Sequence, residues 1–187
     1  MILKIVRYGH PALRRKGALV DVLDTEMRQL ISDMFETMYD AEGIGLAAQQ
    51  VGRALQIAVV DVRGITDRPS TASRDGQPVE VESLMPLVLV NPQIQAVGEP
   101  ATGMEGCLSF PEIFTEITRP ESIDVRALGA DGRTYGFRCG GLLAKAIQHE
   151  VDHLNGVLFI DRMPKATKES FREELDALMV STKAELA

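Results

Sequence analysis

Hydrophobic positions in the first third of the chain change from a helical to an extended pattern. Between residues 24 and 43, apolar side chains recur every three or four positions, which predicts one amphipathic helix capped by Asp24 or Thr25. Its methionines are expected to pack in the core. Residues 2–6 alternate weakly and predict a short edge strand, whereas the β-branched run at 55–62 predicts a buried strand.

The middle third of the chain predicts an antiparallel meander. Residues 63–85 are polar and contain scattered Gly, Pro, Ser and Asp, so we expect a long surface loop with no part in the chemistry. The sequence GADG at 129–132 predicts a hairpin turn. Strands are expected at 87–90, with a continuation at 94–97 after a bulge, and at 113–117, 123–128 and 133–138.

The last third contains a second helix that should be buried. It opens at Gly140-Gly141 and stops at Asn155-Gly156, and it is apolar around most of its circumference. A short strand at 157–160 and a final helix after Pro164 follow. We therefore predict a single α+β domain over 1–187. In this domain, antiparallel or mixed sheets pack around the central buried helix, with one helix near the N-terminus and one near the C-terminus.

Composition narrows the possible partners. The formal net charge of −7 argues against a general grip on nucleic acid through phosphate neutralisation. No apolar run approaches the ~20 residues that a membrane span needs, and no signal-peptide core is present, so a cytoplasmic location is expected. In such a compartment, Cys107 and Cys139 are better explained as free thiols, metal ligands or nucleophiles than as a disulfide.

The buried helix carries the clearest chemical signal, the HExxH sequence of residues 149–153. Residues four apart share one helix face, so His149 and His153 can point at one metal ion, with Glu150 beside them as a proton acceptor. The alternative is a polar helix that carries two histidines by chance. Burial weakens it, because unpaired buried polar groups cost about 1–3 kcal/mol each. His10 lies in a turn-like segment and is expected to cap it or to face solvent.

A catalytic metal site needs three protein ligands and an open position. Cys107, in a predicted strand-exit turn, and Cys139, just before the helix, are both candidates for the third ligand, and spacing alone does not decide between them. The glycines at 43 and 45 permit close backbone approach to a ligand. A phosphate loop is excluded here because no GKS or GKT sequence follows.

Three segments together resemble the peptide deformylases: GIGLAAQQ at 43–50, EGCLS at 105–109 and QHEVDHL at 148–154. They occur in the family's order, and the resemblance covers nearly the whole chain. It implies a metal-dependent hydrolase that removes the N-formyl group from the initiator methionine of nascent polypeptides and releases formate. The implied ligands of one divalent ion, commonly Fe²⁺ with Zn²⁺ or Ni²⁺ able to substitute, are Cys107, His149 and His153. Cys139 matches no family ligand and is assigned to packing.

The resemblance also implies roles around the metal. Glu150 would accept a proton from the attacking water and later deliver it to the leaving amine. The side-chain amide of Gln50 and the backbone N–H of Leu108 match the family's oxyanion donors, and losing one such donor typically costs about 10²–10³ in rate. Gln49 is not the matching position and is expected to face solvent.

Substrate contacts are expected on two elements. The backbone around Ile44 and Gly45 would pair with an extended N-formyl-methionyl peptide, as an added strand does. Leu142 and Ala146 share a helix face with the HExxH histidines and are expected to line the methionine pocket. Lys145 falls in the same region, and the contribution of its stem is left open.

Several alternatives remain at this point. Glu105 and Arg119 either orient a metal ligand or form an ordinary surface pair. A zincin-type metallopeptidase would use HExxH equally well, but it leaves the segments around Cys107 and Gln50 unexplained. A deformylase-like binding protein without activity is opposed by the presence of every expected catalytic residue. The last helix is not strongly basic, so a transient ribosome association, known in the family, gains little support.

Overall fold

The computed structural model describes residues 1–187 as an α+β fold with one antiparallel sheet. The helices are α1 (Thr25–Asp40), α2 (Gly141–Leu154), α3 (Lys165–Ser170) and α4 (Arg172–Glu185). The strands are β1 (Gly45–Ala47), β2 (Ile57–Val60), β3 (Ser70–Arg74), β4 (Gln77–Pro78), β5 (Leu87–Cys107), β6 (Phe110–Leu128) and β7 (Thr134–Gly140). Short 3-10 segments are η1 (Pro11–Arg14), η2 (Ala48–Val51), η3 (Val81–Leu84) and η4 (Phe159–Asp161).

The sheet has the strand order β1-β2-β5-β6-β7-β3-β4, and all neighbours are antiparallel. The predicted antiparallel meander is confirmed, although the strands are longer and form one continuous sheet. The predicted continuation of the 87–90 strand at 94–97 after a bulge is confirmed, because β5 spans both segments with a register shift between Val90 and Gln93. Likewise, β6 merges the two strands predicted after the turn that follows Cys107.

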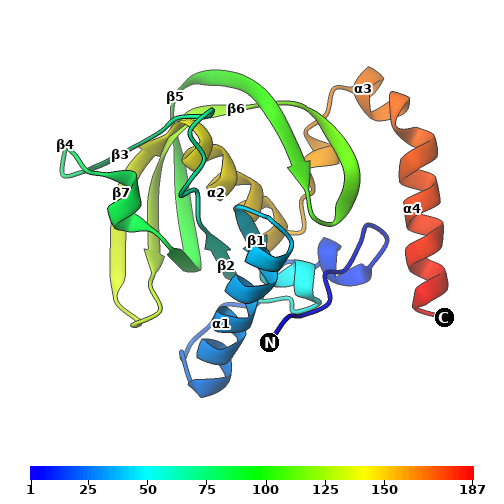
Figure 1. Cartoon of the computed structure of the whole chain (residues 1–187), viewed down its shortest axis with the longest axis horizontal. Helices are drawn as coiled ribbons and strands as arrows, with labels where there is room; N and C mark the ends of the chain where they lie inside the picture. Colours follow the sequence, from blue (N-terminus) through cyan, green and yellow to red (C-terminus); the bar gives the residue numbers. More distant parts are fainter.

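Helix α2 packs against β1, β2, β3, β6 and β7. Figure 1 shows it lying beneath the long β5–β6 ribbon, with α1 and α4 on the outside. The helix starts at Gly141 because this residue adopts φ +66° and a Cβ there would collide with the carbonyl oxygen of Pro69. Leu143, Ala144 and Ile147 are fully buried beneath the sheet.

Helix α1 agrees with its sequence pattern. Asp24 is the N-cap, and its carboxylate accepts a hydrogen bond from the Met27 backbone N–H at 2.9 Å. Met34 and Met38 are fully buried in a second apolar cluster with residues of β1 and β2. The prediction that the helix methionines pack in the core is confirmed.

The segment 63–85 is not the plain loop that was predicted. It contains the β3–β4 hairpin, which turns at Asp75-Gly76 with φ of +50° and +76°, and then η3. β3 pairs with β7 and places Ala72 opposite Cys139. A hairpin of this kind is edge structure with few buried residues, so hydrophobic periodicity misses it; the Asp-Gly dipeptide was the available signal.

Three further predictions near the chain ends are wrong. Residues 2–6 form no strand, because Val6 donates only a single backbone hydrogen bond, to the Gln50 carbonyl at 2.8 Å. Residues 157–160 hold the start of η4 rather than a strand, and their apolar side chains are buried without ladder pairing. The final helix is two helices, α3 and α4, which meet at Phe171.

No helix combines the length and the apolar character needed to cross a membrane. His10 caps η1, where its Nδ1 accepts a hydrogen bond from the Ala12 N–H at 3.1 Å, so the capping prediction is confirmed. Cys139 is buried in the main apolar cluster, and burial raises the pKa of its thiol to about 12. The assignment of this cysteine to packing is therefore confirmed.

Candidate metal centre

The HExxH residues and the end of β5 meet in one cluster. Helix α2 presents His149 and His153 one turn apart, and β5 ends at Cys107 opposite them. One ligand atom from each of the three residues lies within 4.8 Å of the other two. The distance from Cys107 Sγ to His153 Nε2 is 3.3 Å. Of the two cysteines, Cys107 lies in this cluster, whereas Cys139 is buried in the main apolar cluster.

A buried ionic network orients His149. Its Nδ1 lies 3.1 Å from Glu105 Oε2, so Nε2 is the nitrogen left for the cluster. Arg119 holds the Glu105 carboxylate at 2.6 and 3.0 Å and also contacts Asp152 at 2.8 Å. Because the Arg119 side chain is 3% exposed, the alternative of an ordinary surface pair is wrong.

Burial and charge set the protonation states in the network. Burial raises the pKa of Glu105, but contacts from His149 and Arg119 outweigh it and hold this pKa at about 2. Burial lowers the pKa of His149, yet neighbouring Cys107 and Glu105 raise it well above its usual value. Burial lowers the pKa of His153, and its neighbour His149 lowers it further. Burial raises the pKa of Glu150 to about 7.

The cluster fits a divalent transition-metal ion. Two imidazole nitrogens and one sulfur form a borderline-soft donor set that suits Fe²⁺, Zn²⁺ or Ni²⁺, and three protein ligands leave a coordination position open. Within the protein, the buried Glu150 Oε2 and His153 Nδ1 have no hydrogen-bond partner. Glu150 therefore has an unsatisfied acceptor beside the ligands, as a proton acceptor would need.

Gln50 faces the same cluster from η2. Its Oε1 accepts a hydrogen bond from the Ala47 N–H at 2.9 Å, which turns Nε2 toward Cys107 Sγ at 3.6 Å and Ser109 Oγ at 3.4 Å. Leu108 follows Cys107 in the tight turn between β5 and β6. The structure thus brings the two predicted oxyanion donors next to the predicted ligands.

The predicted substrate strand lies beside Glu150. β1 begins at Gly45 and pairs only with β2, so its other edge is free of strand partners. A Cβ at Gly45 would lie 2.9 Å from Glu150 Cδ and closer still to Oε1. Gly45 therefore leaves the space that the Glu150 carboxylate occupies, and Ile44 lies just before it.

Gln49 does not face solvent, contrary to the prediction. It is fully buried, and its Nε2 donates to the Leu154 carbonyl at 3.3 Å. The same carbonyl accepts hydrogen bonds from Gln56 Nε2 at 2.9 Å and from the Gly17 N–H at 2.8 Å. Three separate segments thus hold the end of α2 directly after His153. No sequence signal beyond a glutamine in an apolar stretch pointed to this contact.

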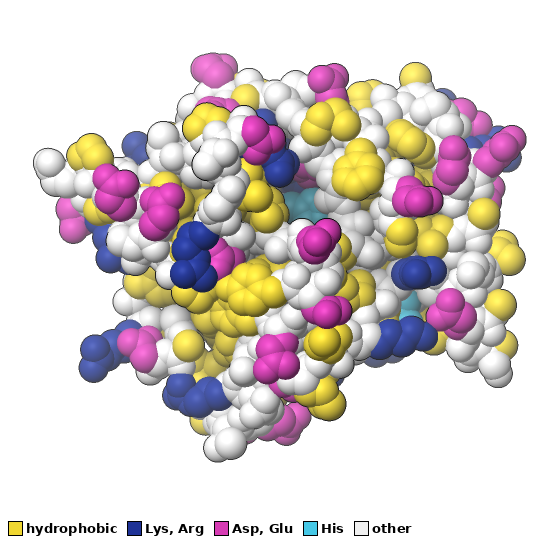
Figure 2. Space-filling model, in the orientation of Figure 1, with side chains coloured by type: hydrophobic (Ala, Val, Ile, Leu, Met, Phe, Trp, Pro, Cys, Tyr) yellow, Lys and Arg dark blue, Asp and Glu magenta, His cyan; other side chains and the backbone are white.

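The predicted pocket residues lie on α2 before the histidines. Leu142 and Ala146 are buried, at 8% and 7% exposure, and Lys145 is half-buried between them in sequence. Figure 2 shows a histidine at the base of a hollow on this face, with hydrophobic side chains around it and charged side chains at the rim.

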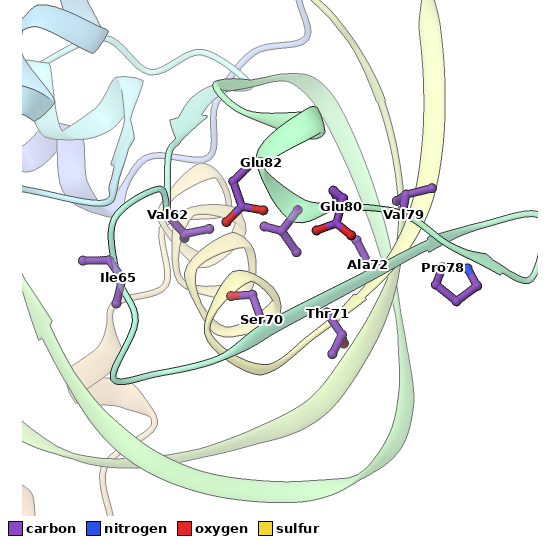
Figure 3. Close-up of a pocket in the computed structure, with 10 residues that line it drawn as sticks. Val62, Ile65, Ser70, Thr71, Ala72, Pro78, Val79, Glu80 and Glu82 are labelled. Carbon is purple, nitrogen blue, oxygen red and sulfur yellow. The ribbon is translucent and has the colours of Figure 1, made fainter.

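A separate cavity of about 390 Å³ lies between β3, β4 and η3. Figure 3 shows the carboxylates of Glu80 and Glu82 between Val62 and Ala72, with Ile65 on the far wall. None of the residues of the metal cluster lines it. No residue of 63–85 belongs to the metal cluster.

Comparison with known proteins identifies the family. The sequence model of the polypeptide deformylase family matches residues 2–169. The chain belongs to the polypeptide deformylase family. Among its relatives, the peptide deformylase of Opitutus terrae is 45% identical over 98% of this chain and 96% of the relative. That of Methylacidiphilum infernorum is 44% identical, over 95% and 93% of the two chains.

Solved peptide deformylases share the fold. The enzyme of Thermus thermophilus matches with a TM-score of 0.80 and 35% identity, covering 99% of each chain. That of Legionella pneumophila matches with a TM-score of 0.79 and 35% identity, covering 95% of each. The α+β fold with an antiparallel sheet and a few helices, predicted from the sequence, is thereby confirmed.

Membership establishes the reaction that the sequence predicted. Polypeptide deformylases are metal-dependent enzymes that hydrolyse the N-formyl group from nascent polypeptides, and this chain is such an enzyme. The zincin-type peptidase and the inactive binding protein are therefore no longer needed as alternatives. The cluster of Cys107, His149 and His153 agrees with a single metal ion.

Proposed function

We propose that Cys107, His149 and His153 hold the one divalent ion of this deformylase, with Fe²⁺ as the ion used in the cell and Zn²⁺ or Ni²⁺ able to replace it. The observation that carries the proposal is the convergence of three ligand atoms within 4.8 Å beside an unpaired buried carboxylate oxygen. When bound, the ion supplies a Lewis acid that lowers the pKa of water and polarises a carbonyl.

Glu150 is the proposed proton carrier. Its Oε2 is buried without a partner, whereas its Oε1 lies close to Gly45. It takes a proton from the attacking water and gives it to the amine nitrogen that leaves as the C–N bond breaks. Because Gly45 begins the proposed substrate strand, the carboxylate lies where the scissile amide of a bound peptide would pass.

Gln50 and Leu108 are the proposed oxyanion donors. The Gln50 amide is held by the Ala47 N–H, so its Nε2 points at the cluster before substrate arrives. The backbone N–H of Leu108 would donate a second hydrogen bond. Such preorganised donors stabilise the negative charge that develops on the formyl oxygen in the transition state.

The substrate is proposed to bind as an extended strand. The free edge of β1, from Ile44 and Gly45, would pair with the peptide backbone, as in strand addition. Leu142 and Ala146 would receive the methionine side chain beside α2. We further propose that residues 1–187 act as one catalytic domain in the cytoplasm, where formylated chains emerge, and that any ribosome contact is transient.

The test combines metal analysis with activity on one sample. Protein purified without oxygen should contain one metal ion per chain and should release formate from formyl-Met-Ala. Cys107→Ala should lose the ion, whereas Glu150→Ala should keep it and lose formate release. If Cys107→Ala kept both the stoichiometric ion and full activity, the ligand assignment would be wrong.

A further inference from the structure

Lys145 occupies an unusual position for a charged residue. It lies four residues before His149 on α2, so both side chains share one helix face, and it is half-buried. It falls between Leu142 and Ala146, the residues proposed to receive the substrate side chain. A cation therefore lies between two apolar residues of α2 that are proposed to form the wall of the pocket for the first side chain.

The end of the Lys145 side chain lies over the backbone of β5. A Cβ at Gly103 would lie 3.6 Å from Lys145 Cε and 3.8 Å from Cδ, and it would collide with Nζ. Gly103 is two residues before Glu105 and four before Cys107, on the strand that delivers both to the metal centre. The missing side chain at Gly103 thus makes room for the ammonium group.

No carboxylate neutralises this ammonium. Lys145 forms no ion pair and no side-chain hydrogen bond, and two acidic residues on the same elements, β5 and α2, are engaged with other partners. Glu105 is held by Arg119 and His149, and Asp152 is held by Arg119 and Arg162. Three N–H donors of a partly desolvated cation are therefore available to an acceptor that enters from outside.

We propose that Lys145 determines substrate specificity, by making this deformylase accept N-formyl peptides whose first side chain ends in a hydrogen-bond acceptor. Methionine sulfoxide is the substrate class that fits best. The inference rests on the proposed binding of the first side chain beside Leu142 and Ala146. The proposed role belongs to the Lys145 ammonium group alone, and the proposed roles of the metal ligands and of Glu150 are unchanged.

The choice of methionine sulfoxide follows from the chemistry of the two side-chain ends. A thioether sulfur is a weak acceptor, and oxidation converts it into a sulfoxide with a strongly accepting oxygen at nearly the same length. A hydrogen bond to a charged donor contributes on the order of a 10–100-fold difference in binding. A wall without this lysine would instead disfavour the polar sulfoxide.

The test compares three substrates that differ only at the end of the first side chain. These are formyl-Met-Ala, its sulfoxide and formyl-norleucine-Ala, assayed by formate release with the metal-loaded enzyme. Lys145→Met should lower the ratio of kcat/KM for sulfoxide over norleucine by about 10-fold or more, chiefly through KM. Lys183→Met on the exposed part of α4 is the matched control and should leave the ratio unchanged.

A second variant separates the ammonium from the general packing of the wall. Gly103→Ala adds a methyl group whose nearest neighbours are the end atoms of the flexible Lys145 side chain, so the ammonium must move while the strand is retained. Methionine at 145 ends one atom earlier, so Gly103→Ala should change the substrate ratio only when lysine is present. The proposal would be overturned if Gly103→Ala changed the sulfoxide-to-norleucine ratio of kcat/KM equally with lysine and with methionine at 145. It would also be overturned if Lys145→Met left this ratio unchanged. If the metal-loaded enzyme without any substitution failed to release formate from formyl-Met-Ala, the proposed function would be refuted instead.

Discussion

The close approach of Gly45 to Glu150 gives a direct test of how the proton carrier is positioned. Gly45→Ala would place a Cβ 2.9 Å from Glu150 Cδ and 3.0 Å from Cγ, with Oε1 closer still. Ordinary contact begins near 3.4 Å, so the carboxylate must move by at least about 0.5 Å. Since a misplacement of about 1 Å can cost on the order of 100-fold in rate, we expect kcat to fall by about 10–100-fold.

Formate release from formyl-Met-Ala and metal content are measured on the same preparations. The matched control is Gly136→Ala, which adds the same methyl group in β7, where its Cβ would meet only the Val125 carbonyl at 3.2 Å. Gly45→Ala should keep its metal and its fold while losing rate, whereas Gly136→Ala should keep its rate. Full activity in metal-loaded Gly45→Ala would refute the argument that the position of Glu150 limits catalysis.

Three further outcomes are expected. Gln50→Leu removes one oxyanion donor and should lower kcat by about 10²–10³ with little change in KM, measured by formate release. Gln56→Leu removes one of the three donors to the Leu154 carbonyl and should lower the free energy of unfolding by about 0.5–1.5 kcal/mol, measured in urea; an unchanged midpoint would contradict this anchoring role. Burial raises the pKa of Asp61, but the contacts from Arg63 and from the Tyr39 hydroxyl outweigh burial, so the pKa lies below its usual value. Its stabilisation is therefore present above about pH 4 and lost as pH falls through the folded pKa, so the stability difference from Asp61→Asn should shrink at acid pH.

The elements predicted best from the sequence are those whose pattern reflects burial of one face. Helix α1 and the opening of α2 at Gly141 agree with their periodicity and stop signals. The β3–β4 hairpin was missed because edge strands are short and polar, and the run at 157–160 was misread because burial alone makes a segment apolar. Periodicity reports which side chains are inside and does not report which backbone groups are paired.

In the candidate centre, too, the features set by local geometry were predicted from the sequence, and those set by long-range contacts were not. HExxH spacing predicted a shared face for His149 and His153, since that follows from helix geometry alone. The choice of Cys107 over Cys139 depended on which strand reaches the helix, which is a long-range property. Gln49 was misjudged for the same reason, because its partner at Leu154 is distant in sequence. Spacing could not reveal either contact.

The two-residue turn between β5 and β6 has a consequence for the order of folding. Pairings near the turn, such as Cys107 with Phe110, close short loops and lose little chain entropy, so the ribbon is expected to form early. β7 pairs with β6 and leads directly into α2, so we expect the histidines to arrive after β7 has added to the ribbon and the helix has docked. The three ligands thus converge late, and an added ion should slow unfolding much more than it accelerates folding.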